Sequence, residues 1–476
     1  MKTIKYVVMS VLMLGMSTSM MAQEEELKAA IDAVKKNAPN KAELVKVAQK
    51  KNKKNPDGLV ALGRALYEQK DTAGAHACAD LANQGIKPKY SCAAAYLLLG
   101  DIESAYGTDG GKAASYYNQA INFDPKNPEG YKKWAMVYRK ISPSQSAKKL
   151  QEMKQNCPNE DVDAITAHIY MLAGDEKSAY ENYMKADITK LDKGELNEFA
   201  RCSYFTGHFA DALRASEAGI KLEPRNPTFN RLAMFSNYEL NNYDAAKVYI
   251  NKYFNETDSA KFSEYDHFYT ALIHQALNEK EEAYKQYDKA LELVNDSSMI
   301  KRWDIMKAVS DSYLADENFE KAIKYYQGFL DTKKGVTMND WAGLGSLHSK
   351  HADKLKTAAE KEAALLKADG VYKDMAEKFE DAEEYATYMR ANINSKLDPD
   401  SKKGLAKPYY EKLAQLIAGK AEKSKSDISM LTTSWHYLMA YNFLVKNDKA
   451  AAKDYANKIL EINPEYAPAI QIRDIK

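Results

Sequence analysis

The sequence has few of the residues that mark a reaction centre or a covalently stapled fold. Four cysteines in 476 residues are too few for a disulfide scaffold. The 68 basic and 67 acidic side chains nearly cancel, which argues against a nucleic-acid-binding protein. It carries no nucleophile elbow, paired-histidine zinc helix, phosphate-cradling glycine loop or dinucleotide fingerprint. We therefore expect a protein that is not an enzyme and has no cofactor.

Long apolar runs are also lacking, except at the N-terminus. Lys2 and Lys5 precede an apolar stretch over 6–16, and small residues follow up to Ala22. This order is typical of a secretory signal peptide, and the run is short for a membrane-spanning helix. We expect residues 1–22 to be a signal peptide and the mature chain to be exported, soluble, and periplasmic or associated with the outer envelope. A membrane anchor is the alternative.

Alternating β-branched runs are missing as well, which favours an all-helical chain. What the chain does have is a recurrent alanine, in steps of 32 to 46 residues. A period in this range is typical of an array in which no unit buries its apolar face alone and neighbouring units must stack. The column consists of Ala75, Ala113, Ala147, Ala179, Ala212, Ala246, Ala283, Ala322, Ala368, Ala406 and Ala452.

The side chains around each alanine follow a helical spacing. Ala283, Tyr287 and Ala290 are four and three residues apart and fall on one helix face. Small residues there let two helices approach closely, whereas larger ones would cost about 1 to 3 kcal/mol per site by overpacking. A proline such as Pro125 or Pro464 follows the second helix and stops it.

These features resemble the tetratricopeptide repeat, a helical hairpin of about 34 residues. The resemblance implies an all-α solenoid of about 11 such hairpins, stacked in a right-handed superhelix with a concave groove. Residues 23–55 are expected to be N-terminal capping helices and 56–335 a regular array. Irregular repeats with insertions and a capping helix are expected over 336–476, where the segment 358–378 favours a lengthened helix.

The resemblance also implies which positions of the first helices face the groove. In this sequence they form a basic strip mixed with aromatic rings, which suits an acidic peptide or partner protein, because guanidinium groups grip carboxylates. The alternative is an ordinary solvated helix face. The strip consists of Lys132, Arg139, His168, Asn197, Arg201, Tyr204, Arg231, Phe235 and Tyr238.

The first functional hypothesis is thus an exported scaffold for protein–protein interaction, possibly part of an envelope assembly. The alternative is a glycan- or nutrient-binding module of the cell envelope, because similar arrays form the core of sugar-binding proteins. Such proteins carry exposed tryptophans on a large lobe outside the repeats. The four tryptophans here, Trp134, Trp303, Trp341 and Trp435, fall within helices of the expected array.

Two further residue pairs carry weaker signals. Cys78 and Cys92 lie where a hairpin turn can bring them together, so they are either a disulfide or two buried thiols. Cys157 and Cys202 are expected to be free. His348 and His351 share a helix face, with Asp353 beyond, but two ligands without a clear third favour a polar face over a metal site. We expect no metal.

Overall fold

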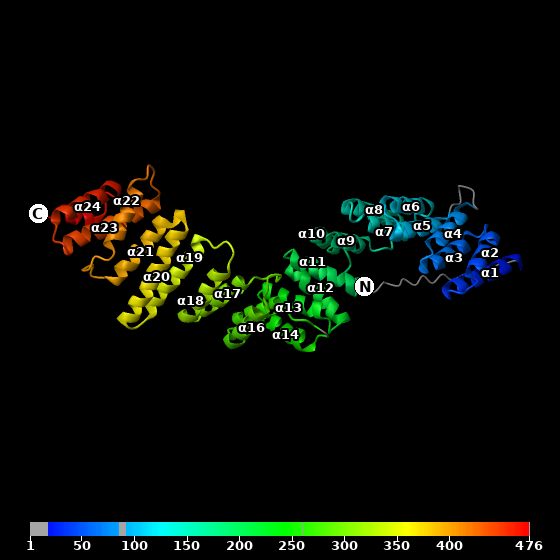
Figure 1. The fold of residues 1–476 in the computed structure, drawn as a ribbon, viewed down its shortest axis with the longest axis horizontal. Coiled ribbons are helices and arrows are strands. Elements are labelled where there is room, and N and C mark those ends of the chain that lie inside the picture. Colours follow the sequence, from blue (N-terminus) through cyan, green and yellow to red (C-terminus); the bar gives the residue numbers. More distant parts are fainter. Residues whose placement is uncertain (1–17, 85–91, 259, 476) are drawn as a thin grey trace. The chain divides into compact units, whose positions relative to one another are not determined.

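The computed structural model describes residues 18–84, 92–258 and 260–475, and within them it contains twenty-five α-helices and no strand (Figure 1). The chain divides into two compact units, Met1–Ala260 and Lys261–Lys476. In each unit an odd-numbered helix packs against the even-numbered helix that follows it. The chain is therefore an all-α solenoid of helical hairpins, as the alanine period predicts.

The first unit contains fourteen of these α-helices and one π-helical turn, η2. They are α1 (Thr18–Lys35), α2 (Lys41–Lys51), α3 (Pro56–Glu68), α4 (Thr72–Gln84), α5 (Ala93–Tyr106), α6 (Gly110–Phe123), α7 (Pro128–Tyr138), α8 (Pro143–Asn156), α9 (Val162–Ala173), α10 (Glu176–Tyr183), α11 (Lys193–Phe205), α12 (Phe209–Leu222), α13 (Pro227–Glu239), α14 (Tyr243–Asn251) and η2 (Lys252–Glu256).

The second unit contains the other eleven α-helices and a 3₁₀ turn, η3. They are α15 (Glu264–Ala276), α16 (Lys280–Leu293), α17 (Arg302–Ala315), α18 (Phe319–Thr332), α19 (Met338–Lys354), α20 (Ala358–Lys378), η3 (Glu380–Ala382), α21 (Glu383–Leu397), α22 (Lys407–Ala418), α23 (Lys425–Leu444), α24 (Lys449–Ile462) and α25 (Ala467–Arg473). Between α3 and α24 the described chain forms eleven hairpins.

Several first helices begin with the same sequence signal, asparagine followed by proline. The side-chain oxygens of Asn55, Asn127 and Asn226 accept backbone N–H groups of α3, α7 and α13 at 2.9 to 3.0 Å. The proline that follows has no N–H to leave unpaired at the helix start. Because such a cap contributes about 1 kcal/mol, the start of each of these hairpins is fixed locally.

The alanine column forms the packing seam of the array. Ten of its eleven members are at most 1% exposed, and Ala147 is the exception. Tyr117, whose position corresponds to that of Tyr287, packs across the first helix of its hairpin, and a Cβ on Gly100 would clash with its ring. Small residues are thus required where the two helices of a hairpin cross.

The prediction for Ala147 is wrong by one residue. Ser146 is fully buried in its place, and Leu150 and Met153 continue the buried face of α8. The Ser146 hydroxyl donates to the carbonyl of Ala135 in α7 at 2.9 Å, which satisfies its buried polar atom. Helix α8 begins at Pro143, so Ser146 is its fourth residue, the position that Ala75 and Ala212 hold in α4 and α12.

Residues near the N-terminus cover the open end of the first hairpins. Leu27, Ala30 and Val34 of α1 pack with Ala48 of α2 in one apolar cluster that continues into α3. Val47 of α2 is 37% exposed. Residues 1–17 of the expected signal peptide lie outside the described residues, and α1 begins at Thr18. Among the described residues, no helix is long and apolar enough to cross a membrane.

The boundary between the compact units lies before α15. After α14 the chain forms η2, and Asp258 is tied back to Arg225 by a 2.7 Å ion pair. The change from regular to irregular repeats at residue 336 is a different division and stays a prediction. The lengthened helix expected over 358–378 is α20, of 21 residues, with the same bounds.

Candidate peptide-binding strip on the first helices

The nine residues of the first-helix strip lie on four consecutive first helices of the first unit. Lys132 lies on α7 and Arg139 at its C-terminal end, His168 lies on α9, and the remaining residues lie on α11 and α13. Helix α9 packs against both α7 and α11, and α11 packs against α13. The array therefore places equivalent positions of neighbouring repeats side by side.

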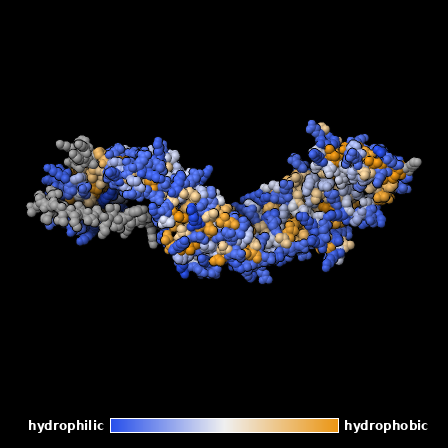
Figure 2. Space-filling model, turned by 180° about the vertical axis from the view of Figure 1, so that it is seen from behind, coloured by the Kyte–Doolittle hydropathy of each residue, from blue (hydrophilic) through white to orange (hydrophobic). Residues whose placement is uncertain are grey.

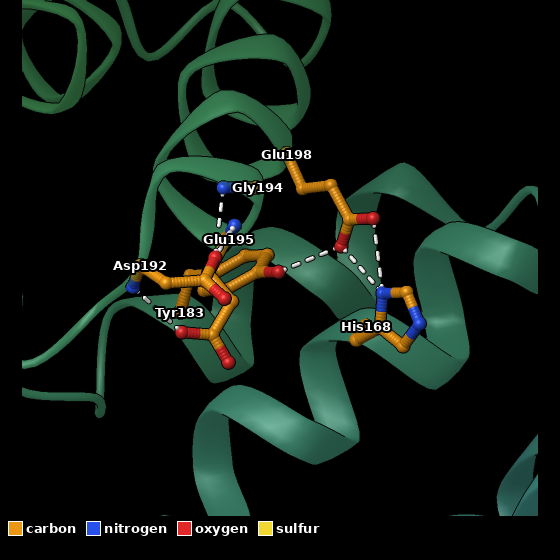
Figure 3. A network of polar contacts seen from close by, with 6 residues as sticks. All are labelled: His168, Tyr183, Asp192, Gly194, Glu195 and Glu198. Carbon is orange, nitrogen blue, oxygen red and sulfur yellow. Dashed lines mark hydrogen bonds and ion pairs between the residues drawn. The ribbon is translucent and has the colours of Figure 1, made fainter. Parts of the chain in front are cut away.

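His168 is part of a hydrogen-bonded network between hairpins (Figure 3). Its Nδ1 lies 2.9 Å from both carboxylate oxygens of Glu198 on α11. The buried hydroxyl of Tyr183, on α10, donates to the same carboxylate at 2.8 Å. The hydrogen bond to Glu198 raises the pKa of His168 above its usual range, and burial raises the pKa of Tyr183. Glu198 thus joins two successive hairpins.

A capping box fixes the start of α11 and so the position of Glu198. The Asp192 carboxylate accepts the backbone N–H groups of Gly194 and Glu195 at 2.7 and 2.9 Å. The Glu195 side chain in turn accepts the N–H of Asp192 at 2.9 Å (Figure 3). Three backbone N–H groups at the N-terminus of α11 thus find acceptors, which fixes where the helix begins.

Lys132 and Arg139, the two other cationic residues in the first half of the strip, also form contacts within the chain. Lys132 forms an ion pair with Glu160 at 2.7 Å. Arg139 donates to the carbonyl of Met136, and its Nε is buried without a hydrogen-bond partner in the described structure. These contacts neutralise part of the positive charge that the sequence alone attributes to the strip.

Arg201 differs from these residues. Its side chain is exposed, and it forms no ion pair with any residue in the part of the chain that the structure describes. Asn197, one helical turn earlier on α11, is half-buried. An exposed guanidinium on a capped helix, with no ion pair to another described residue, is suited to a carboxylate from outside the chain.

The aromatic members of the strip serve mainly to pack α11 against α13. Tyr204 and Phe235 are only 8% and 2% exposed, and their ring centroids are 5.9 Å apart. The Arg231 guanidinium lies 5.2 Å from the Phe235 ring centroid. Tyr238 is half-buried beside Tyr243. Contrary to the expectation of ligand-covering rings, Tyr204 and Phe235 offer almost no surface, because the next hairpin covers them.

The sequence reasoning missed the acidic residues near the strip. Besides Glu198 and Glu160, Asp101 on α5 is nearly buried and holds Lys133 of α7 at 2.7 Å and the Tyr117 hydroxyl at 3.0 Å. Arg64 of α3 approaches the same carboxylate at 3.4 Å. The signal in the sequence is a carboxylate about one repeat away from a cation.

Exposed apolar side chains near the strip were also only partly anticipated. Met136, Leu172 and Phe205 are each more than a third exposed, at the ends or on the outer faces of α7, α9 and α11. Hydrophilic and hydrophobic patches alternate on the face of the molecule shown in Figure 2. The surface on this face is therefore mixed in hydropathy.

Of the two alternatives for Cys78 and Cys92, the disulfide is not formed, and all four cysteines are free. Cys78 faces the preceding helices: its sulfur accepts a hydrogen bond from Gln49 of α2 at 3.1 Å and packs near Gly63 of α3. Cys92 instead stands at the N-terminus of α5. The two thiols thus belong to different contacts, which decides between the alternatives in favour of unpaired thiols.

The histidine pair on α19 and the four tryptophans are used in packing. Burial, with a contribution from Lys367, lowers the pKa of His348 to about 4, and the His351 ring stacks on Phe319 at 5.6 Å. Asp353 pairs with Lys396 at 2.9 Å. The described residues contain no cluster of three or more metal-ligating side chains. Trp134 is buried, and the other three tryptophans are half-buried against apolar clusters.

No family model and no curated protein matches the chain. Among solved structures it is similar to the C-terminal part of a TPR repeat-containing protein from Cytophaga hutchinsonii, with 24% identity, 59% of this chain and 100% of that chain covered, and a TM-score of 0.42. A tetratricopeptide repeat protein from Parabacteroides merdae has 15% identity, 56% and 98% coverage and a TM-score of 0.32. Pseudomonas aeruginosa pilF has 14% identity, 44% and 96% coverage and a TM-score of 0.33.

The repeat period, the successive helical hairpins and the buried alanine seam are observations of this chain itself. Together they show an all-α solenoid whose helical hairpins resemble the tetratricopeptide repeat.

Proposed function

We propose that the protein is an exported interaction scaffold that binds an acidic segment of a partner protein along the first-helix strip. The observation that carries this proposal is Arg201: an exposed guanidinium without an internal ion pair, on a helix whose neighbours are cross-linked by the Glu198 network. Helix packing holds its backbone in place before any ligand arrives, which lowers the entropy lost on binding.

Each of the other residues of the strip is expected to contribute only modestly to the binding free energy. Lys132 is already paired, so a ligand carboxylate must compete with Glu160 for it. Met136, Leu172 and Phe205 supply apolar surface that suits a segment with alternating acidic and apolar side chains. The N-terminal charge and hydropathy pattern supports export, and thus a partner in the cell envelope.

The proposal is tested with a labelled acidic peptide and with Arg201→Glu, using fluorescence polarisation at two salt concentrations. A charge reversal at a contacting guanidinium is expected to weaken binding by more than tenfold, which corresponds to about 1.4 kcal/mol. The matched control is Lys177→Glu on α10, an exposed cation that forms no ion pair with any described residue and lies on the second helix of its hairpin. Equal binding by the wild type and both variants would remove the strip from the mechanism.

A further inference from the structure

Helix α10 is shorter than the other second helices around it. It contains eight residues, whereas α6, α8 and α12 contain 14 each. The chain leaves α10 at Met184 and reaches α11 through a linker, residues 184–192. In this linker the Asp187 carboxylate accepts the backbone N–H and the hydroxyl of Thr189 at 3.0 and 2.7 Å. The linker is therefore a defined turn that replaces the last part of a helix.

A pocket of about 370 Å³ lies where this linker meets the C-terminal half of α12. Ile188 and Leu191 line it from the linker, and Ala218 and Leu222 line it from α12. Leu222 is 59% exposed, so this side of the pocket presents apolar surface to solvent. No residue of the first-helix strip lines this pocket, so it is a separate surface.

The α12 side of the pocket has the spacing of a helix-packing face. Arg214, Ala218, Lys221 and Leu222 are separated by four, three and one residues, so they follow one side of the helix over about two turns. In a regular pair of second helices of equal length, more of this face would be covered. Because α10 ends at Tyr183, the face is left with an apolar centre and a cation at each end.

The cations at the two ends of this face differ in whether they already form an ion pair. Lys221 is exposed and has no ion-pair partner within the described ranges. Arg214 is held by Asp211 at 3.1 Å and lies over the Phe199 ring, yet its side chain remains half exposed. One carboxylate, Glu217, also lines the pocket, and it accepts the Tyr249 hydroxyl at 3.2 Å. Lys221 is therefore the one cation lining the pocket that has no ion-pair partner among the described residues.

We propose that this pocket binds a short amphipathic helix of a partner protein. A bulky apolar side chain of that helix occupies the space beside Ala218 and Leu222, and a carboxylate one turn away pairs with Lys221. A helix fits better than an extended strand because the exposed face of α12 has helical spacing and offers no free backbone edge for strand addition. The bound helix supplies the packing that the shortened α10 does not.

The probe for this site is a labelled peptide of about twelve residues, roughly three helical turns, with leucine and glutamate one turn apart on one face. Two copies of the peptide replace the leucines by alanine or the glutamates by lysine. Fluorescence polarisation is measured with the full chain and with Leu222→Asp and Lys221→Glu. Both changes are at exposed positions, and thermal unfolding followed by circular dichroism checks that the variants fold.

The matched controls lie on α16, whose Leu293 occupies the position equivalent to Leu222 and is also exposed. We expect Leu222→Asp and Lys221→Glu to weaken binding of the acidic peptide by about tenfold or more, whereas Leu293→Asp and Lys289→Glu leave it unchanged. The lysine peptide should bind Lys221→Glu more tightly than wild type. Absence of binding to wild type, or equal binding to wild type and Leu222→Asp, would overturn the proposal. Arg201→Glu distinguishes this site from the first-helix strip, because it should leave this peptide's affinity unchanged.

Discussion

Replacing Glu198 tests whether its carboxylate joins two hairpins of the first unit. Glu198→Ala removes the acceptor of the buried Tyr183 hydroxyl and the partner of His168. A buried hydroxyl left without a partner costs about 1 to 3 kcal/mol. The ion pair adds no more than about 1 kcal/mol, because the imidazole is 37% exposed and solvent screens it. We therefore expect a loss of roughly 2 to 3 kcal/mol in local stability.

Native-state hydrogen exchange of the amides in α9, α10 and α11 is the appropriate assay, since repeat arrays open locally. Glu198→Gln keeps an acceptor for Tyr183 but removes the charge, so it should cost less than about 1 kcal/mol. Glu181→Ala, at an exposed position of α10, is the control and should have no effect. If Glu198→Ala changes the exchange free energy no more than Glu181→Ala does, the network does not join the hairpins.

The same pair predicts a pH dependence of stability. The folded pKa of His168 is raised, so its contribution is fully present below the unfolded pKa of about 6.5. It is lost as the pH rises through the folded pKa. Protection of α9 and α11 should therefore decrease above that range in the wild type, and this part of the decrease should be absent in His168→Gln. An identical pH profile in both proteins would refute the assignment.

Three further perturbations test other parts of the structure. Ser146→Leu places a large side chain in the buried seam and should destabilise the chain by about 1 to 3 kcal/mol, whereas Ala147→Leu should be nearly neutral in thermal unfolding. The reverse order would restore the register first expected from the sequence. Lys70 has a positive φ of 65° at the α3–α4 turn, so Lys70→Gly should stabilise the chain by about 1 kcal/mol in chemical unfolding, and Lys70→Ala should not. Burial raises the pKa of the Cys202 thiol to about 12, so this thiol should resist alkylation at pH 8 until the protein unfolds. The half-buried Cys92 should react sooner. Mass spectrometry of tryptic peptides measures the alkylation of both cysteines.

The sequence by itself determined the hairpins and most of the seam. These depend on local rules: the crossing of two helices requires small residues, and asparagine followed by proline starts a helix through its own side chain. The seam position of Ala283 and the capping role of Asn127 can therefore be predicted without knowledge of any distant residue. The lengthened α20 was predictable for the same reason, because its composition favours a helix throughout.

Only the tertiary structure decided which side chains remain available for binding. Lys132 and His168 look like free charges in the sequence, but their acidic partners lie 28 and 30 residues away and approach only when hairpins stack. Phe235 is buried by its neighbouring hairpins, and Ser146 holds the seam position where Ala147 was expected. Likewise, the pocket on α12 depends on where the preceding second helix, α10, ends. Pairing and burial depend on the relative positions of neighbouring hairpins, and a repeat pattern records a helix's own spacing but not what its neighbours contribute.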